Sequence, residues 1–181
     1  YGIQPDMVTM AKGVASGYAA IACLVTTDAV FDMFKDDASD PLNYFRDIST
    51  FGGCTAGPTA GIENMRIIED EGLLENTTKM GHYMLEQLHG LADKHKIIGD
   101  VRGKGLFLGA ELVQDRDGRT PFDPAQKVVP SIVGEMAKAG VIARAMPQGD
   151  IIGYAPPFCL TREEADTVVS ATADAIKATL G

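Results

Sequence analysis

The stretch Asp6-Met-Val-Thr-Met-Ala-Lys12-Gly13 decides how this chain is expected to fold. Its mostly apolar segment, residues 7–11, predicts a short buried strand that ends in one lysine, and the glycine predicts a turn. In an open α/β sheet, ligands bind just beyond the carboxyl ends of the strands, which is where Lys12 lies. Partial burial there would favour a neutral amine nucleophile. The alternative is an ordinary strand-end lysine whose charged group reaches solvent.

Composition and charge exclude several classes of protein. The chain has 181 residues and a formal net charge of -9, which argues against a nucleic-acid partner. It has no apolar run of membrane-spanning length and no signal-peptide pattern. Its three cysteines lie far apart, which indicates a reducing, cytoplasmic location and no metal site. The first residue is Tyr1 rather than methionine, so we expect a processed or partial chain.

The order of the expected elements indicates an α/β protein in two parts. We expect residues 1–75 to be the C-terminal part of a large α/β domain and residues 76–181 to be a small α+β domain with the order β-β-α-β-β-α. Capping signals at Asp123-Pro-Ala-Gln126 and Thr161-Arg-Glu-Glu164 mark two helix starts. The expected strands cover residues 7–11, 21–26, 97–101, 106–113, 141–144 and 151–154, with a tight turn at 102–105, and other helices begin near residues 58 and 74.

Two further regions could bind an anion. Residues 48–58, which include Ser49 and Thr50, are dense in hydroxyls and glycines and lead into a helix start at Pro58. Backbone N–H groups and hydroxyls of this kind hold phosphates, although an ordinary loop has the same composition. Arg144 ends an apolar segment before a loop, where a guanidinium can bind a carboxylate or sulfonate through two hydrogen bonds. A structural salt bridge is the alternative for Arg144.

Several motifs resemble, in the same order, those of the class III (ω-type) pyridoxal-phosphate-dependent aminotransferases of fold type I. The similarity runs along essentially the whole chain, and the segment Asp47 to Pro58 looks most like the taurine–pyruvate branch of that family. The motifs are Pro5 to Gly13 around Lys12, the loop centred on Thr50, Asp100-Val-Arg-Gly-Lys-Gly-Leu106, and Arg144 with Gly149-Asp150 and Ala155-Pro-Pro157.

The resemblance implies a transaminase that moves an amino group from a small-molecule ω-amine donor, with taurine as a candidate, to pyruvate. Lys12 would hold pyridoxal 5'-phosphate as an internal Schiff base and then carry the proton between substrate and cofactor. Thr50 would donate a hydrogen bond to the cofactor phosphate in the neighbouring subunit's site of a homodimer, and Ser49 would help through its backbone. Arg144 would pair with the acid group of pyruvate or alanine.

Two features depart from the family pattern. The run Phe51 to Pro58 is longer than the family's loop and lacks its histidine. The family's amino-terminal half, which supplies the phosphate cup, the ring-stacking aromatic residue and the pyridinium carboxylate, has no counterpart in these residues. Two alternatives therefore stay open. The chain could be a catalytically incomplete fragment that acts only in subunit interaction, or another class III enzyme, such as a decarboxylase or aminomutase.

Overall fold

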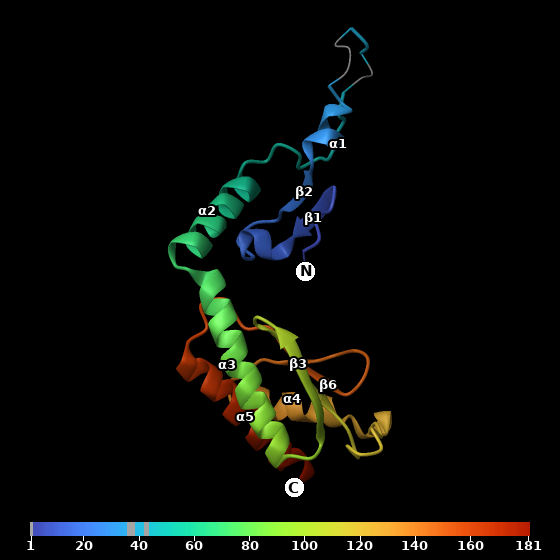
Figure 1. Ribbon diagram of the computed structural model, residues 1–181, viewed down its shortest axis with the longest axis vertical. Helices are drawn as coiled ribbons and strands as arrows, with labels where there is room; N and C mark the ends of the chain where they lie inside the picture. The colour runs from blue at the N-terminus through green and yellow to red at the C-terminus, as the bar shows by residue number, and fades with distance from the viewer. Residues whose placement is uncertain (1, 36–38, 42–43) are drawn as a thin grey trace. The chain divides into compact units, whose positions relative to one another are not determined.

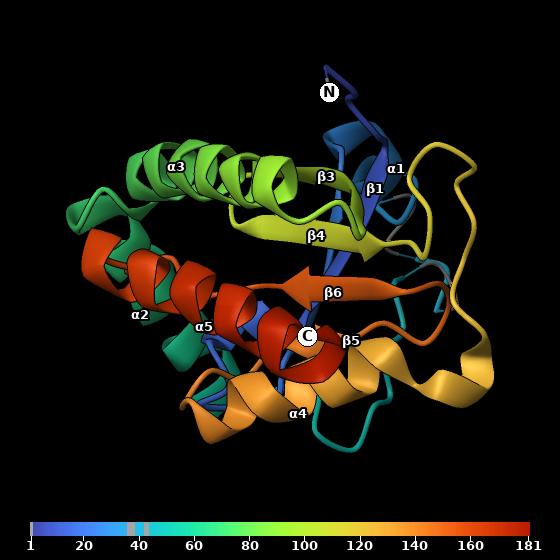
Figure 2. The same ribbon diagram turned by 90° about the horizontal axis from the view of Figure 1, so that it is seen from below.

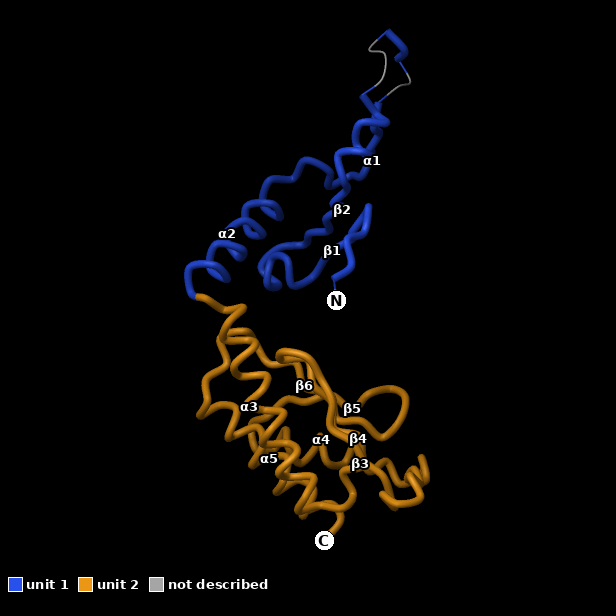
Figure 3. The backbone as a smooth tube through the Cα atoms, viewed as in Figure 1, with its two compact units in different colours: residues 1–71 blue, residues 72–181 orange. Residues whose placement is uncertain are grey.

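The computed structural model describes residues 2–35, 39–41 and 44–181 of the chain (Figure 1). The chain divides into two compact units, Tyr1–Glu71 and Gly72–Gly181 (Figure 3). The loop expected between residues 35 and 41 lies only partly within the described residues. The division falls a few residues before the boundary expected after residue 75, at a glycine with φ 62° that precedes a helix. The assignment of the two units as family domains stays a prediction.

The first unit contains one pair of antiparallel strands. β1 (Met7–Ala11) pairs with β2 (Ala22–Thr26), and the 3-10 helix η1 (Lys12–Ala15) lies between them in sequence. The short helix α1 (Asp28–Asp32) follows β2, and α2 (Ala56–Asp70) ends the unit. α2 packs against η1. Gly61 of the helix lies next to Val14 of this turn, and Gly57 lies next to Ala20 in the segment that follows it.

The prediction that β1 is buried is wrong. All of its residues are exposed, and the side chain of Met7 is 58 % exposed. Among the described residues of this unit, only Ala15, Gly57 and Gly61 are buried. The physical reason is that α2 packs on η1 rather than over the strand pair. An apolar pattern indicates that a strand is suited to burial, but the strand is buried only where another element covers it.

The second unit packs three helices against one face of a four-stranded antiparallel sheet (Figure 2). The sheet order is β3-β4-β6-β5, and its buried face and the helices form one hydrophobic core that includes Met84, Leu88, Ile132 and Ile152. The expected order β-β-α-β-β-α is confirmed. The elements are α3 (Leu73–Lys94), β3 (Ile98–Lys104), β4 (Phe107–Leu112), η2 (Pro124–Gln126), α4 (Val128–Lys138), β5 (Arg144–Ala145), β6 (Ile151–Tyr154) and α5 (Arg162–Leu180).

Three boundaries in this unit differ from the sequence prediction. The strand expected at residues 141–144 is only β5, Arg144–Ala145, because residues 141–143 do not pair with β6. β3 continues to Lys104, so the tight turn expected at 102–105 lies later, where Gly105 has φ 54°. Asp123 does accept a hydrogen bond from the backbone N–H of Ala125 at 2.9 Å, but it caps only η2. The α-helix begins at Val128, because Lys127 has φ 49° and interrupts the helical path.

The helix start predicted at Thr161 is confirmed. The Thr161 hydroxyl accepts a hydrogen bond from the backbone N–H of Glu164 at 3.2 Å, and the Glu164 carboxylate accepts one from the backbone N–H of Thr161 at 2.8 Å. The bond from the Thr161 backbone N–H, and then one that the Thr161 hydroxyl donates to Glu164 Oε2 at 3.0 Å, lower the pKa of Glu164, because they stabilise its charged form. The reciprocal pair satisfies two N–H groups that the first turn of α5 would otherwise leave without partners.

Gly81 of α3 marks a close approach between that helix and the β3–β4 turn. A Cβ added at Gly81 would lie 2.3 Å from the carbonyl oxygen of Gly105. We expect Gly81→Ala to force the helix and the turn apart and to lower the free energy of unfolding by about 1–3 kcal/mol. This loss outweighs the better helix propensity of alanine. Chemical denaturation measures the change.

Gly90, in the same helix, provides the matched control. A Cβ at Gly90 would meet nothing within 4 Å. Gly90→Ala should therefore raise the free energy of unfolding by about 0.5–1 kcal/mol, because alanine loses less backbone entropy in a helix. If the two substitutions changed stability in the same direction and to the same extent, the close packing at Gly81 would be refuted.

Candidate active site

Lys12 lies where the sequence predicts it, directly after the carboxyl end of a strand. It is the first residue of η1, and its side chain is exposed rather than half-buried. Its backbone has φ 56°, in the left-handed region, which costs a non-glycine residue about 1–2 kcal/mol. Conformations of this kind persist where the surrounding structure holds them, and they are concentrated at functional sites. The amine is therefore accessible on a constrained turn.

Ser49 and Thr50 lie together on the loop before α2, and both are exposed. The backbone N–H and the hydroxyl of Ser49 donate hydrogen bonds to Asp47 Oδ1 at 2.9 and 2.6 Å. The hydroxyl bond and then the backbone bond lower the pKa of the Asp47 carboxyl. Within the described part of the chain, the Thr50 hydroxyl forms no hydrogen bond. Thr50 is thus free to donate to a ligand, while both donors of Ser49 are already engaged.

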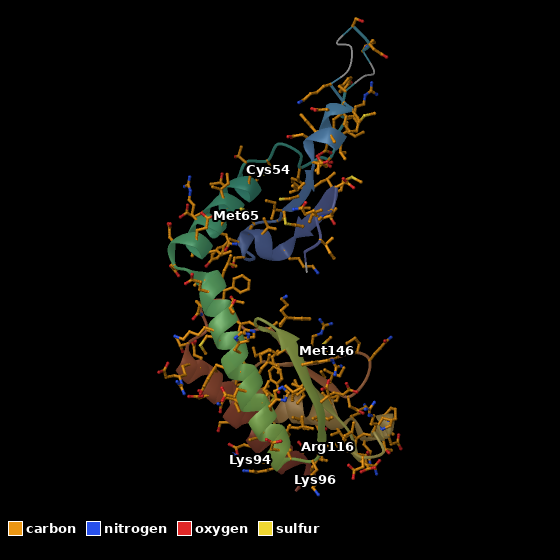
Figure 4. The ribbon with its side chains drawn as sticks, viewed as in Figure 1. Cys54, Met65, Lys94, Lys96, Arg116 and Met146 are labelled. Carbon is orange, nitrogen blue, oxygen red and sulfur yellow. The ribbon has the colours of Figure 1, made fainter. Side chains whose placement is uncertain are left out.

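A cavity of about 950 Å³ lies within the first unit. Its walls are mostly apolar and come from β2, the loop before α2, and α2 itself; Cys54 and Met65 of this wall are labelled in Figure 4. Ser49 lines this cavity, whereas Lys12 and Thr50 do not. The cavity therefore does not bring the lysine and the threonine together.

Arg144 lies on the second unit, in the edge strand β5. It pairs with Gly153 of β6, which pairs with Gly109 of β4, which in turn pairs with Arg102 of β3. Directly paired residues of antiparallel strands project from the same face of a sheet. The two arginines therefore stand on the open face, at opposite ends of a row whose middle is formed by two glycines.

The two arginines of this row differ in their charge environment. Arg102 forms ion pairs with Asp100 at 2.5 Å and with Glu111 at 2.6 Å, and hydrogen bonds to these carboxylates raise the pKa of the guanidinium. Arg144 is exposed and has no ion pair with any of the described residues. Its side chain is not used in a structural salt bridge here. The guanidinium of Arg144 is thus available for an acid group from a ligand.

The predicted site residues fall into two groups. Lys12, Ser49 and Thr50 belong to the first unit, and Arg144 belongs to the second. Across residues 2–35, 39–41 and 44–181, no cluster of three or more metal-binding side chains is found. No helix in the same ranges is long and apolar enough to cross a membrane.

Sequence reasoning missed Asn64, a residue of α2 that binds the backbone next to Lys12. Its side-chain Nδ2 donates to the carbonyl oxygens of Gly13 and Val14, both at 3.1 Å. It also missed Met146, whose sulfur would lie 2.9 Å from a Cβ at Gly153, beside Arg144 (Figure 4). The spacing Gly57-x-x-x-Gly61-x-x-Asn64, which puts three small or polar residues on one helix face, was the available signal for Asn64.

The class of protein has two parts. One is an α/β unit with an accessible lysine after a strand, and the other is a small α+β unit whose open sheet face carries an arginine without an ion pair to any described residue. The chain belongs to the aminotransferase class-III family, whose profile matches residues 1–176. The resemblance predicted from the motifs is confirmed, and so is the C-terminal part of a fold type I transferase as its fold.

Among curated relatives, the chain is 55 % identical to the hypotaurine/taurine–pyruvate aminotransferase of Paracoccus denitrificans, over 97 % of this chain and 39 % of that protein. It is 59 % identical to the taurine–pyruvate aminotransferase of Rhodobacter capsulatus, over 88 % of this chain and 34 % of that protein. The chain thus spans less than two fifths of the length of these relatives.

A solved structure shows the same fold. It is an amine transaminase from an uncultivated Pseudomonas species in the PLP-bound (internal aldimine) form. The two chains are 32 % identical with a TM-score of 0.85, and the match covers 98 % of this chain and 39 % of that one.

Proposed function

We propose that this chain is part of a pyridoxal-phosphate-dependent transaminase that moves an amino group from an ω-amine donor, taurine or hypotaurine, to pyruvate. The observation that carries the proposal is the exposed Lys12 on a left-handed turn, in a chain 55–59 % identical to enzymes named for this reaction. The experiments use the full-length protein, that is, the natural polypeptide that contains these residues.

The residues present fit pyridoxal phosphate at two points. Lys12 offers an accessible primary amine that would hold the cofactor covalently. The unengaged hydroxyl of Thr50 would donate a hydrogen bond to its phosphate. Ser49 would contribute only after release from Asp47, because its N–H and hydroxyl are both bonded there. When bound, the cofactor supplies an electron sink for removal of a proton from the substrate carbon.

Lys12 and Arg144 would have separate tasks in the reaction. The Nζ atom of Lys12 would act as the base that takes the proton from the amine-bearing carbon of the substrate. The planar guanidinium of Arg144 would bind the carboxylate of pyruvate through two hydrogen bonds and so orient the acceptor. The same group would suit the sulfonate of taurine, because two oxygens of this tetrahedral anion can accept the paired N–H bonds, as those of a phosphate do.

A homodimer is part of this proposal. Thr50 is exposed and does not line the cavity of its own unit, which supports a role for its hydroxyl in a neighbouring subunit's site. The exposed apolar side chains of the strand pair, such as Met7 and Leu24, also suit burial by further protein. A cytoplasmic location agrees with the three free cysteines.

The test is formation of alanine from pyruvate by the full-length protein supplied with pyridoxal phosphate. We expect alanine to form with taurine or hypotaurine as donor, and not when either the donor or pyruvate is omitted. Release of carbon dioxide from an added amino acid, without formation of alanine, would point to a decarboxylase instead. Movement of the amino group within a single substrate would point to an aminomutase. Either result would refute the transaminase.

A further inference from the structure

The side chain of Asn64 in α2 forms hydrogen bonds with the turn that carries Lys12. Asn64 Nδ2 donates to the carbonyl oxygens of Gly13 and Val14, both at 3.1 Å, across about fifty residues of sequence. These two carbonyls belong to the first residues after Lys12. Within the described chain, they are the only backbone groups of η1 that a side chain binds. Asn64 is half-buried; its hydrogen bond to Val14 is partly shielded from water, whereas its bond to Gly13 is exposed.

The turn needs such a restraint because its backbone is unfavourable. Lys12 has φ 56°, and Ser16, which ends η1, has φ 50°. Two non-glycine residues in the left-handed region within five positions cost about 1–2 kcal/mol each. A backbone of this kind persists only where its surroundings over-determine it. The two hydrogen bonds from Asn64 hold the segment between the strained positions.

The face of α2 that carries Asn64 is shaped for close contact with this turn. Gly57, Gly61 and Asn64 are spaced four and three residues apart, so they lie on one face of the helix. A Cβ at Gly57 would lie 2.9 Å from the carbonyl oxygen of Ala20. A Cβ at Gly61 would lie 3.5 Å from the Val14 side chain. Gly57 therefore allows a close approach of α2 to the segment that follows the turn, and a Cβ at Gly61 would make only an ordinary contact with Val14.

We propose that Asn64 is a positioning residue for Lys12: its amide fixes the turn after Lys12 and thereby directs the lysine amine. This inference rests on the proposed function of Lys12. A misplaced amine transfers a proton less well, because an error of about 1 Å in a reacting group can cost a factor of about one hundred. In the proposed function, the carboxylate of pyruvate is bound by Arg144 of the second unit and not by this turn. Loss of Asn64 should therefore lower kcat and leave the KM for pyruvate nearly unchanged.

The experiment compares Asn64→Leu with wild type in the full-length protein. We expect kcat to fall by about 10–100-fold with a KM for pyruvate within about threefold. We also expect faster hydrogen exchange of the backbone amides in residues 12–18, measured by mass spectrometry with and without pyridoxal phosphate. Asn64→Ser, which keeps one donor, serves if the leucine variant does not fold, and should show the same changes to a smaller extent.

Asn76 of α3 is the matched control. Its Nδ2 also donates to two carbonyl oxygens, those of Phe158 at 2.6 Å and Leu160 at 3.1 Å, but within the second unit. Asn76→Leu removes the same kind of bond pair, and it should leave kcat within about twofold and exchange in residues 12–18 unchanged. An equal loss of kcat in both variants would mean a general effect of lost stability and would overturn the proposal.

The remaining outcomes separate the inference from the proposed function. If the wild-type protein transaminates but Asn64→Leu keeps its kcat, the positioning role is wrong, whether or not exchange at residues 12–18 increases. If the wild-type protein neither binds pyridoxal phosphate nor forms alanine, the proposed function fails. In that case an unchanged exchange rate in Asn64→Leu would also show that the amide does not restrain the turn.

Discussion

Lys12→Ala in the full-length protein is expected to lower amino transfer to pyruvate by about 10²–10⁴-fold or more. That range is the usual contribution of a positioned proton-transfer group alone, and the variant also loses the amine that would hold the cofactor. The visible absorbance of lysine-bound cofactor should disappear with it. Absorbance spectra and alanine formation, measured on the same samples, check both effects.

Two controls separate chemistry from folding in this experiment. Lys12→Gly removes the amine as well but relieves the left-handed backbone at φ 56°, so it should be equally inactive and at least as stable. Lys96, an exposed lysine after α3, is labelled in Figure 4, and Lys96→Ala should keep full activity. Retention of both the absorbance and turnover by Lys12→Ala would disprove the assignment of the lysine.

Arg144→Ala is expected to weaken the use of acid-bearing substrates selectively. A hydrogen-bonded contact to a charged group contributes about 1.5–3 kcal/mol, which corresponds to a loss of about 10–150-fold in kcat/KM for pyruvate. Amines without an acid group should be affected little when they serve as donors. Steady-state kinetics with pyruvate and with an uncharged acceptor aldehyde measure the difference. Arg144→Lys should recover only part of the loss, because an ammonium group cannot form the paired contact.

Arg102 is the matched control for Arg144. Both arginines are exposed on the same row of the same sheet face, but Arg102 is neutralised by Asp100 and Glu111. Arg102→Ala should therefore leave kcat/KM for pyruvate within about twofold, since exposed ion pairs contribute little. An equal effect of the two substitutions would mean that Arg144 acts through general surface charge rather than through a contact with the acid group.

The second unit could be predicted well from sequence because its signals are local. The capping box at Thr161 and Glu164 forms as expected, and the order β-β-α-β-β-α is present. The start of α4 could not be predicted from sequence. Asp123 and Pro124 do form a helix cap, but the element they begin is the 3-10 helix η2 and not α4. What displaces the helix is the left-handed backbone of Lys127, and lysine gives no sequence signal for that conformation.

For the candidate site, too, some features could be predicted from sequence and others depend on the structure. The motif around Lys12 locates the lysine after a strand, and motif order was sufficient to pick out Thr50 and Arg144, whose roles remain predictions. The availability of the Arg144 guanidinium is a result of the structure, since spacing alone left a salt bridge equally open. Arg144 and Arg102 lie in one row across the sheet because of the strand register, which aligns residues more than forty positions apart in sequence.

By itself, the sequence determined the family and the order of the elements and singled out Lys12 as the candidate reactive lysine, because each depends on residue types at short, fixed spacings. Only the tertiary structure decided how Lys12 is held. Its strand is exposed rather than buried, and the two carbonyl groups that follow it accept hydrogen bonds from Asn64 of α2, about fifty residues away. The physical reason is that burial and hydrogen-bond partners are set by packing between distant segments, and local patterns carry no information about which segments meet.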